Sequence, residues 1–364
     1  MSATTSPMIR LAPVPFEELP AHPSFPDGSS SESNTRPDLL RFARALLDQG
    51  RSLAQPTQFN AAFRPHSRKS SPPSPSEVEI LSTTVSAVDI GGLPWSSSSG
   101  EILRSKPARI EDEHWFARRS YHRDQPSKGD DSKAAAGGTA SWQEFVYGLR
   151  DQHSEHECEF TPSLYDARLV CDWTEQVNDR LLASGTAGPD SEGPEYTHAT
   201  MAVYEMCHRL PAIVGPRCFP VLVATASCSA DEFVAVTVPV DIARFAGAFY
   251  SNSRNRAEGA GRQMKKAVTL GEYCAVERVV RCAGQTTRVD GGGSTRVQRG
   301  QAPEEIEWVM ATASHARGNI PMSMQRMGIP GAIAKDVGFF LKWIHNVPEE
   351  EIRSQSQRTS AARP

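Results

Sequence analysis

Three side chains near the middle of the chain could bind a metal ion: His153, His156 and Cys158, in the segment HSEHEC. Imidazole nitrogens and thiolates are common zinc ligands, but a closed zinc site takes four ligands, and no fourth follows at a recognisable spacing. The seven cysteines include no C-x-x-C pair, so neither a zinc ribbon nor a disulfide framework is indicated. We expect these residues to form a solvated helix end, and we expect no metal ion or other cofactor.

Sequence motifs for catalysis are absent. The chain has no G-x-S-x-G nucleophile elbow, no H-E-x-x-H pair and no P-loop, and Gly259 and Gly261 lack the third glycine of a dinucleotide-binding loop. His198, His208 and His315 lie near the ends of predicted strands, where they could act as acid or base if they face a pocket. Hydrogen-bonded structural histidines are the alternative, so the sequence does not identify an enzyme.

Three charged residues lie in predicted strands or directly before one, where some of them would be buried. Arg217 precedes an apolar strand, where it could bind a carboxylate, phosphate or hydroxyl group of a ligand, or brace a loop. Glu277 and Arg278 are neighbours in another predicted strand, so one of them faces inward if the sheet has one buried side. A charge buried in this way is either paired or functional.

A run of basic residues lies between two predicted strands. Its members are Arg254, Arg256, Arg262, Lys265 and Lys266. Such a run could contact the headgroups of anionic lipids at about 1 kcal/mol for each charge, and a solvated loop is the alternative. The whole chain has 39 basic and 43 acidic residues, a balance that does not indicate a nucleic-acid partner.

The chain has no segment that resembles a membrane span. Its most hydrophobic stretch, Gly328 to Ile344, is interrupted by Lys335, Asp336 and Lys342, and it falls short of about 20 uninterrupted apolar residues. Acidic residues near the start disfavour a transit peptide. We therefore expect a cytosolic, or cytoplasmic, protein.

Two segments carry the signals of amphipathic helices. Leucine and alanine recur at helical spacing from Pro37 to Leu53, with Asp38 near the N-terminal end. Ser141 and Glu144 match a capping box at the start of a shorter helix. Residues 1–35 are rich in Pro and Ser, so we expect them to be loose except around Phe16 and Leu19.

The remaining body predicts an antiparallel sheet, because β-branched and aromatic residues recur in short runs. From Glu305 to Thr312, the side chains of Ile306, Trp308 and Met310 point one way and the residues between them point the other. The glycine-rich run RVDGGGSTRV predicts a hairpin between the last two strands. Strands are predicted at Val78–Val88, Trp115–Tyr121, Tyr196–Cys207, Cys218–Ser227, Phe233–Val240, Val268–Cys282 and Glu305–Ser314.

The chain closes with a predicted helix from Pro321 to His345. Pro330 lies inside it and should kink or restart the helix. Its apolar stripe comprises Ile333, Val337, Phe340, Leu341 and Ile344, behind Met322, Met324 and Met327. After Pro348 the chain is polar, and we expect it to fray.

These elements predict an α+β fold with one main domain. Residues 1–76 form an N-terminal extension that is partly disordered and contains the helix near 37–53. Residues 77–346 form the domain, with polar insertions near 125–139 and 284–303, and residues 347–364 form a flexible tail.

Three segments resemble landmarks of START (StAR-related lipid transfer) domains, in the same order. His208–Thr225 (HRLPAIVGPRCFPVLVAT) has a proline-bearing loop and an arginine, Arg217, before a strand. Leu270–Val279 (LGEYCAVERV) resembles the Gly-Glu-Tyr opening of a strand, and His315–Pro321 (HARGNIP) resembles the Gly-x-Ile-Pro turn into the final helix. With SWQEFVYGLRDQH and the ending GIPGAIAKDVGFFLKWI, they look most like a fungal START-related family of uncharacterised function, over roughly Trp115 to Ile344.

The resemblance implies a helix-grip fold, in which a curved antiparallel sheet wraps around a long C-terminal helix. It also implies an internal cavity for a sterol, a phospholipid or another lipid. The expected ligand-binding residues are Arg217, Trp308, Met310, Met324, Met327, Ile333, Val337 and Phe340. Ordinary core packing is the alternative for the apolar ones.

The first functional hypothesis is binding, and transfer, of a lipid or other hydrophobic small molecule. The second is an enzyme of the cyclase or hydrolase type that acts on a polyketide-like substrate in the same cavity, an analogy at the level of the fold. A polar cluster inside the pocket would favour the second. A third is an adaptor whose disordered extension recruits partners while the domain senses lipid.

Overall fold

The computed structural model describes most of the chain. The described residues are 7–25, 36–95, 104–128, 138–184, 196–210, 215–256, 268–282, 285–289, 295–299, 304–318, 320 and 322–361.

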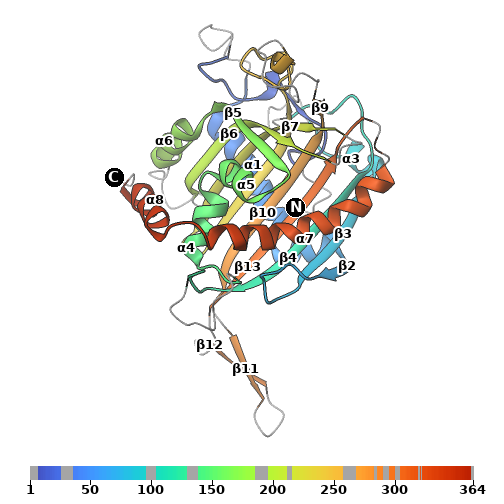
Figure 1. Cartoon of the computed structure of the whole chain (residues 1–364). Helices are drawn as coiled ribbons and strands as arrows, with labels where there is room; N and C mark the ends of the chain where they lie inside the picture. Colours follow the sequence, from blue (N-terminus) through green and yellow to red (C-terminus); the bar gives the residue numbers. More distant parts are fainter. Residues whose placement is uncertain are drawn as a thin grey trace.

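One large sheet organises the described residues (Figure 1). Nine strands follow one another across it and pair antiparallel: β2 (Arg64–Lys69), β3 (Val78–Val85), β4 (Glu113–Arg123), β13 (Glu305–His315), β10 (Glu272–Cys282), β8 (Glu232–Asp241), β7 (Arg217–Ser229), β6 (Thr197–His208) and β5 (Leu164–Asp172). Two short strands add parallel pairs, β1 (Val14–Pro15) to β8 and β9 (Thr269–Leu270) to β7. The predicted hairpin is present as β11 (Gln285–Val289) and β12 (Thr295–Arg299), so this prediction is confirmed.

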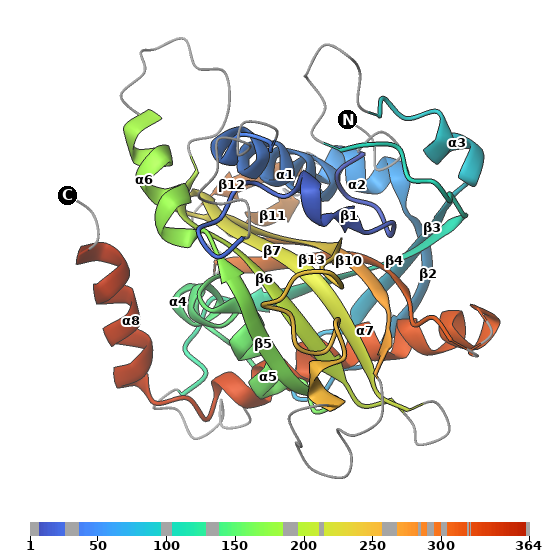
Figure 2. The ribbon, with the colours of Figure 1, turned by 90° about the horizontal axis from the view of Figure 1, so that it is seen from above.

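Helices cover both faces of the sheet (Figure 2). One face carries α1 (Leu39–Ala54), α2 (Pro56–Ala62), α3 (Ala87–Gly91) and α6 (Thr174–Ser184). The other carries α4 (Trp142–Phe145), a π-helical turn (Val146–Arg150), α5 (His153–Phe160), α7 (Met322–Ile344) and α8 (Glu349–Ala361). Single 3₁₀ turns lie at Phe16–Glu18 and Arg254–Arg256. The fold class is α+β, and α7 runs along the face that the sheet curves around, the helix-grip arrangement.

Alternation along each strand builds two separate cores, since successive side chains point to opposite faces. On β8, Val234, Val236 and Val238 pack toward α1, whereas Phe233 packs toward α7. On β13, Ile306, Trp308 and Met310 face α7, as the sequence pattern predicts. In a two-layer protein one face of the sheet contacts solvent. Here helices cover both faces of the sheet.

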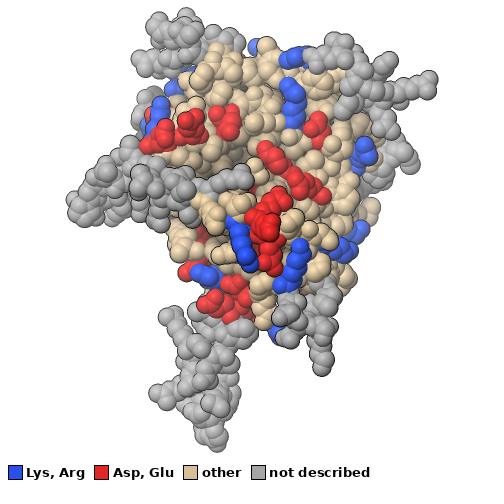
Figure 3. All heavy atoms as spheres, turned by 60° about the vertical axis from the view of Figure 1, so that its left-hand side comes forward, with Lys and Arg blue, Asp and Glu red and all other residues tan. Residues whose placement is uncertain are grey.

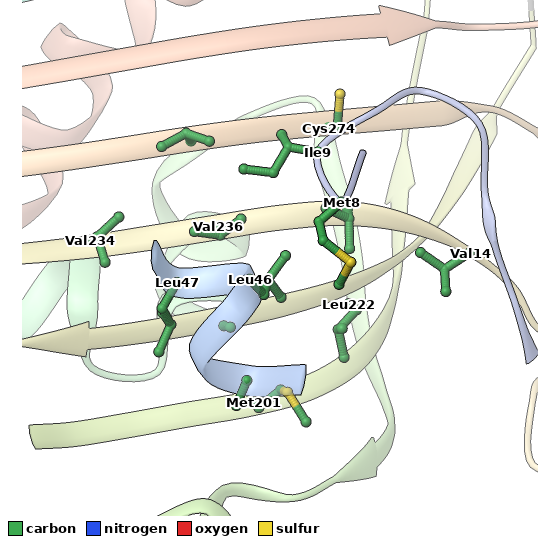
Figure 4. Close-up of a cluster of buried hydrophobic side chains, with 14 of the residues drawn as sticks. Met8, Ile9, Val14, Leu46, Leu47, Met201, Leu222, Val234, Val236 and Cys274 are labelled. Atoms are coloured by element: carbon green, nitrogen blue, oxygen red, sulfur yellow. The ribbon is translucent and has the colours of Figure 1, made fainter. Parts of the chain in front are cut away.

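The N-terminal residues differ from the expectation of a loose segment. Met8, Ile9 and Val14 are buried against α1 and the outer face of the sheet (Figure 4). Two buried charged groups hold this segment: Arg104 donates to the carbonyls of Pro7 (3.0 Å) and Met8 (2.9 Å), and Glu113 accepts from the backbone N–H of Leu11 (2.8 Å). The sequence pattern failed here because the apolar residues are few and aperiodic, and their partners are distant in sequence.

Helix α1 packs closely on β8 and occupies nearly the range predicted from Pro37 to Leu53. Its N-terminus is capped by Asp38, whose carboxylate accepts from the backbone N–H of Arg41 (2.9 Å). A Cβ added at Gly50 would lie 2.3 Å from the Val236 side chain. Glycine at this position therefore lets the helix approach the sheet.

Other segments also differ from the sequence-based expectations. Part of the predicted N-terminal extension 1–76 forms the edge strand β2, and β5 and α6 do not correspond to any predicted element. The chain after Pro348 is not frayed throughout, because α8 forms there and buries Ile352. Pro330 lies within α7, which continues on both sides of it. No helix among the described residues is both long and apolar enough to cross a membrane.

Candidate functional site

The space between the sheet and α7 is the candidate site, and its apolar wall combines five of the predicted residues. Trp308 and Met310 come from β13, and Ile333, Val337 and Phe340 come from α7. All five are at most 5% exposed. The rings of Trp308 and Phe340 meet edge to face, with 5.4 Å between their centroids. The structure therefore brings these five residues into one buried cluster.

The other predicted site residues lie elsewhere. Met327 is 76% exposed on α7, and the side chain of Met324 lies outside the described residues. Arg217 is buried but turned to the loop between β13 and α7, where it donates to the carbonyls of Ala316 (2.6 Å) and Arg317 (3.3 Å). Its hydrogen bonds brace that loop, the alternative that the sequence left open.

A charged group that the sequence analysis missed lies on the α7 side of the sheet. Arg118, on β4, is 1% exposed, and its Nη2 lies 3.5 Å from Oε2 of Glu277 on β10. The guanidinium carbon stands 3.7 Å from the ring centroid of Trp308, whose Nε1 donates to the same carboxylate oxygen (2.7 Å). Cation–π contact and ion pairing thus hold the charge inside the fold.

These contacts leave Arg118 partly unsatisfied. Its Nε and Nη1 are buried and have no hydrogen-bond partner. A guanidinium has five N–H donors, and buried donors without an acceptor cost free energy. The Nε and Nη1 of Arg118 therefore carry three N–H donors for which the described residues supply no acceptor.

Three further polar side chains interact electrostatically with Arg118: Glu157 from α5, Tyr273 from β10 and Asp336 from α7. Burial raises the pKa of Glu157 to about 7 and that of Asp336 to about 6, although Arg118 lowers both. Burial also raises the pKa of the Tyr273 hydroxyl. Yet all three retain accessible surface. These side chains are therefore not fully enclosed by the described residues.

The apolar residues on this face of the sheet form two separate clusters. Met206, Val221 and Val223, on β6 and β7, form a cluster of their own, separate from the cluster that contains Trp308 and Phe340. Both clusters belong to the same face of the sheet, and Tyr273 packs at the edge of the first. Seen from the side of β5, α6 and α8, the surface is hollowed, and acidic side chains stand around the hollow (Figure 3).

The raised pKa values predict how stability depends on pH. Between about pH 4 and pH 7 the folded state binds more protons at Glu157 and Asp336 than the unfolded state does. The stability that these groups contribute is therefore complete below their ordinary pKa values and is lost as pH rises through 6 and 7. We expect Asp336→Asn and Glu157→Gln to gain free energy of unfolding relative to wild type between pH 5 and pH 8, by roughly 1 kcal/mol.

Urea denaturation followed by tryptophan fluorescence at several pH values measures this difference. Glu159→Gln, at an exposed position on α5, serves as the control and should run parallel to wild type. A difference that shifts in favour of wild type as pH rises would contradict the assignment.

The neighbours Glu277 and Arg278 resolve as the alternation requires, and both are paired. Glu277 faces α7 with Arg118, and Arg278 faces α1, where its Nε donates to Glu232 (2.8 Å). Arg51 of α1 donates to the same carboxylate (2.8 Å). Arg278 is buried because helices also cover the face of the sheet to which it points.

His153 and His156 differ from the expected solvated helix end. His153 and His156 are buried rather than solvated: Nδ1 of His153 lies 2.6 Å from the carbonyl of Leu149, and His156 packs on Tyr147 and Trp343. Among the described residues, no group of three His, Cys, Asp or Glu side chains is placed to hold a metal ion.

The predicted basic patch is only partly described. Arg254 donates to the carbonyl of Ala246 (2.6 Å) and so holds its own loop. The side chain of Arg256, and residues Arg262, Lys265 and Lys266, lie outside the described part of the chain.

Two surface grooves lie on the opposite side of the sheet, beside the N-terminal segment. They share Ala12, Pro107, Arg109, Glu272 and Arg317. Arg317 donates to both carboxylate oxygens of Glu272 (2.7 and 2.6 Å), so the charges in these grooves compensate one another. The uncompensated donors of Arg118 make the interior the stronger candidate.

Comparisons with known proteins give one family model and several solved structures. A family model described as "Protein of unknown function (DUF3074)" matches residues 115–344. No curated protein matches the chain. Solved structures with a similar fold are human STARD10 (TM-score 0.43, 10% identity, 88% of this chain and 85% of that chain), human StAR-related lipid transfer protein 5 (0.41, 8%, 82% and 95%) and the lipid transfer and protein localization domain of human StarD13 (0.37, 10%, 80% and 96%).

Proposed function

This chain belongs to the DUF3074 family, and we propose that it binds a lipid or other hydrophobic small molecule inside the fold, between the sheet and α7. The observation that carries the proposal is Arg118, a buried cation whose Nε and Nη1 have no hydrogen-bond partner among the described residues. A ligand with one polar end would supply the missing acceptor.

The walls of the site suit the rest of such a ligand. Met310, Ile333 and Val337 present aliphatic surface, and Trp308 and Phe340 present aromatic surface. Removing apolar ligand surface from water contributes about 25 cal/mol per Å². In an apolar pocket, a small number of polar groups typically fixes the orientation of the ligand. The START resemblance of the sequence supports the same class of ligand.

Transfer between membranes belongs to the proposal as well. The basic run that includes Arg254 would contact anionic headgroups while the ligand enters or leaves. Transfer of a fluorescent lipid between donor and acceptor vesicles, with and without anionic lipid, measures this activity.

An enzyme of the cyclase or hydrolase type is the second candidate, and one observation favours it. Glu157 and Asp336 have pKa values near 7 and 6, the range in which a carboxyl group works well as acid or base. A polyketide-like substrate in the same space would lie against these groups. Turnover that Glu157→Gln or Asp336→Asn abolishes, with binding retained, would favour the enzyme.

Filling the interior tests the binding proposal directly. Ala275 lies between Tyr273 and Glu277 on the α7 face of β10 and is 3% exposed. We expect Ala275→Trp to occupy the ligand's space and to reduce uptake of a fluorescent lipid at least about tenfold, because the indole and the ligand cannot overlap.

Lipids extracted from the purified wild-type and variant proteins, identified by mass spectrometry, provide an independent measurement. Ala332→Phe, at an exposed position on α7, is the control and should bind normally. Thermal denaturation establishes that the variants are folded. A wild-type protein that carries no lipid and takes up none would refute the proposal.

A further inference from the structure

Acidic groups outnumber basic ones around the interior space. Arg118 faces three carboxyl groups, those of Glu157, Glu277 and Asp336. Glu277 alone lies within ion-pair distance of Arg118, at 3.5 Å, and it also accepts from Trp308. Glu157 and Asp336 have no ion pair among the described salt bridges, and Glu157 interacts electrostatically with the buried His153 as well as with Arg118.

The four groups converge from four different elements. Arg118 comes from β4, Glu277 from β10, Glu157 from α5 and Asp336 from α7. Charged residues on one helix can line up on a solvated face through helical periodicity alone. The residues here come from separate elements, so that explanation does not apply to them. Lys335, the neighbour of Asp336, is exposed and supplies no compensating charge at the interior.

Two nitrogens of Arg118 also lack hydrogen-bond partners, although Arg118 lies among carboxyl groups. Its Nε and Nη1 are buried without a hydrogen-bond partner although three carboxyl groups lie around it. The interior therefore presents unsatisfied donors beside two carboxyl groups that have no ion pair among the described residues. A single polar group of one sign satisfies only half of this arrangement.

We propose that the bound ligand carries, at its polar end, a protonated amine next to an oxygen acceptor: the oxygen binds Arg118, and the ammonium group binds Asp336 and Glu157. This inference rests on the proposed function and narrows its ligand from any amphiphile to an amino-amphiphile. A fatty acid would place a second anion beside the carboxyl groups, and a simple alcohol would leave them without a cation.

Three single-chain probes of equal length test the inference. They are 2-aminohexadecan-1-ol, hexadecane-1,2-diol, which has a hydroxyl in place of the amine, and hexadecanoic acid. Each competes with a fluorescent lipid for the full-length protein at pH 7.5. We expect the amino alcohol to bind about tenfold or more tightly than the diol, because it forms charge-assisted hydrogen bonds, and the acid to bind most weakly.

Variants connect this preference to the named carboxyl groups. Asp336→Asn, Glu157→Gln and the double variant should each reduce the ratio of amine to diol affinity, with the double variant bringing it close to one. Glu159→Gln, exposed on α5, should leave the ratio unchanged. Affinity for the diol checks that the variants still fold and bind.

The outcomes separate the two proposals. Equal binding of the three probes, tighter binding of the acid, or an amine preference that survives in the double variant would overturn the inference and leave internal binding in place. A protein that binds none of the probes and no fluorescent lipid would overturn both.

Discussion

A chain that starts at residue 77 is expected to aggregate rather than fold. It lacks the edge strand β2 and also the N-terminal segment, α1 and α2, which cover much of one face of the sheet. From α1 alone, Phe42, Leu46 and Leu47 are completely buried. Burying one such side chain contributes about 1.5–3 kcal/mol, and a whole domain is stable by only about 5–15 kcal/mol. The truncation would also expose a wide apolar surface.

Size-exclusion chromatography and circular dichroism of the truncated chain measure this outcome. A monomer with a cooperative thermal transition would contradict the expectation. A finer comparison uses two substitutions in α1: Leu46→Asp, which buries a charge, should prevent folding, whereas Arg41→Asp, at an exposed position, should be tolerated.

This expectation changes how the N-terminal residues are interpreted. The sequence analysis divided the chain at residue 76 into an extension and a domain. In the structure, Met8 and Leu46 belong to the same core as Val236 of the sheet (Figure 4). Removing residues 1–76 therefore does not test the adaptor hypothesis, because the truncated chain also loses part of the core.

Replacing Arg118 is expected to have the second large effect. Arg118→Met removes the cation from beside Glu277, whose carboxylate then lacks its ion-pair partner. Breaking a buried ion pair from one side costs about 3–5 kcal/mol, and binding of an amphiphile should be lost with it. Arg123→Met, at an exposed position on the same strand, is the control.

Because Arg118→Met could fail to fold, Arg118→Lys separates binding from stability. Lysine keeps the charge near Glu277 but loses the planar stack on Trp308 and the donors Nε and Nη1. We expect a folded protein whose affinity for a fluorescent lipid falls at least about tenfold. Unchanged affinity in a folded Arg118→Lys protein would show that Arg118 does not contact the ligand.

Local sequence patterns determined the elements that repeat on a short scale. Ser141 and Glu144 form the predicted capping box, because both partners lie within one helical turn. The alternation of Ile306, Trp308 and Met310 gave the correct buried face of β13, since a strand has a period of two. The helix-grip architecture came from landmarks that resemble START domains, not from periodicity.

The polar group of the site could not be found in this way. Arg118 lies in the segment HWFARRSYHR, where its neighbour Arg119 has the same charge and a different role on the opposite face. Strand alternation separates the two residues but does not tell which face is the interior. The sequence shows Asp336 only as a charge that interrupts the hydrophobic stretch of the closing helix, and helical periodicity assigns such polar positions to solvent.

The sequence by itself determined the antiparallel strands, the closing helix and the apolar faces of β13 and α7, because each depends on residues close together in the chain. Only the tertiary structure decided that Arg118 pairs with Glu277 inside the fold, that Asp336 interacts electrostatically with both, and that the N-terminal residues complete the core. Burial of a charge depends on which distant elements cover it, and local periodicity carries no information about those elements.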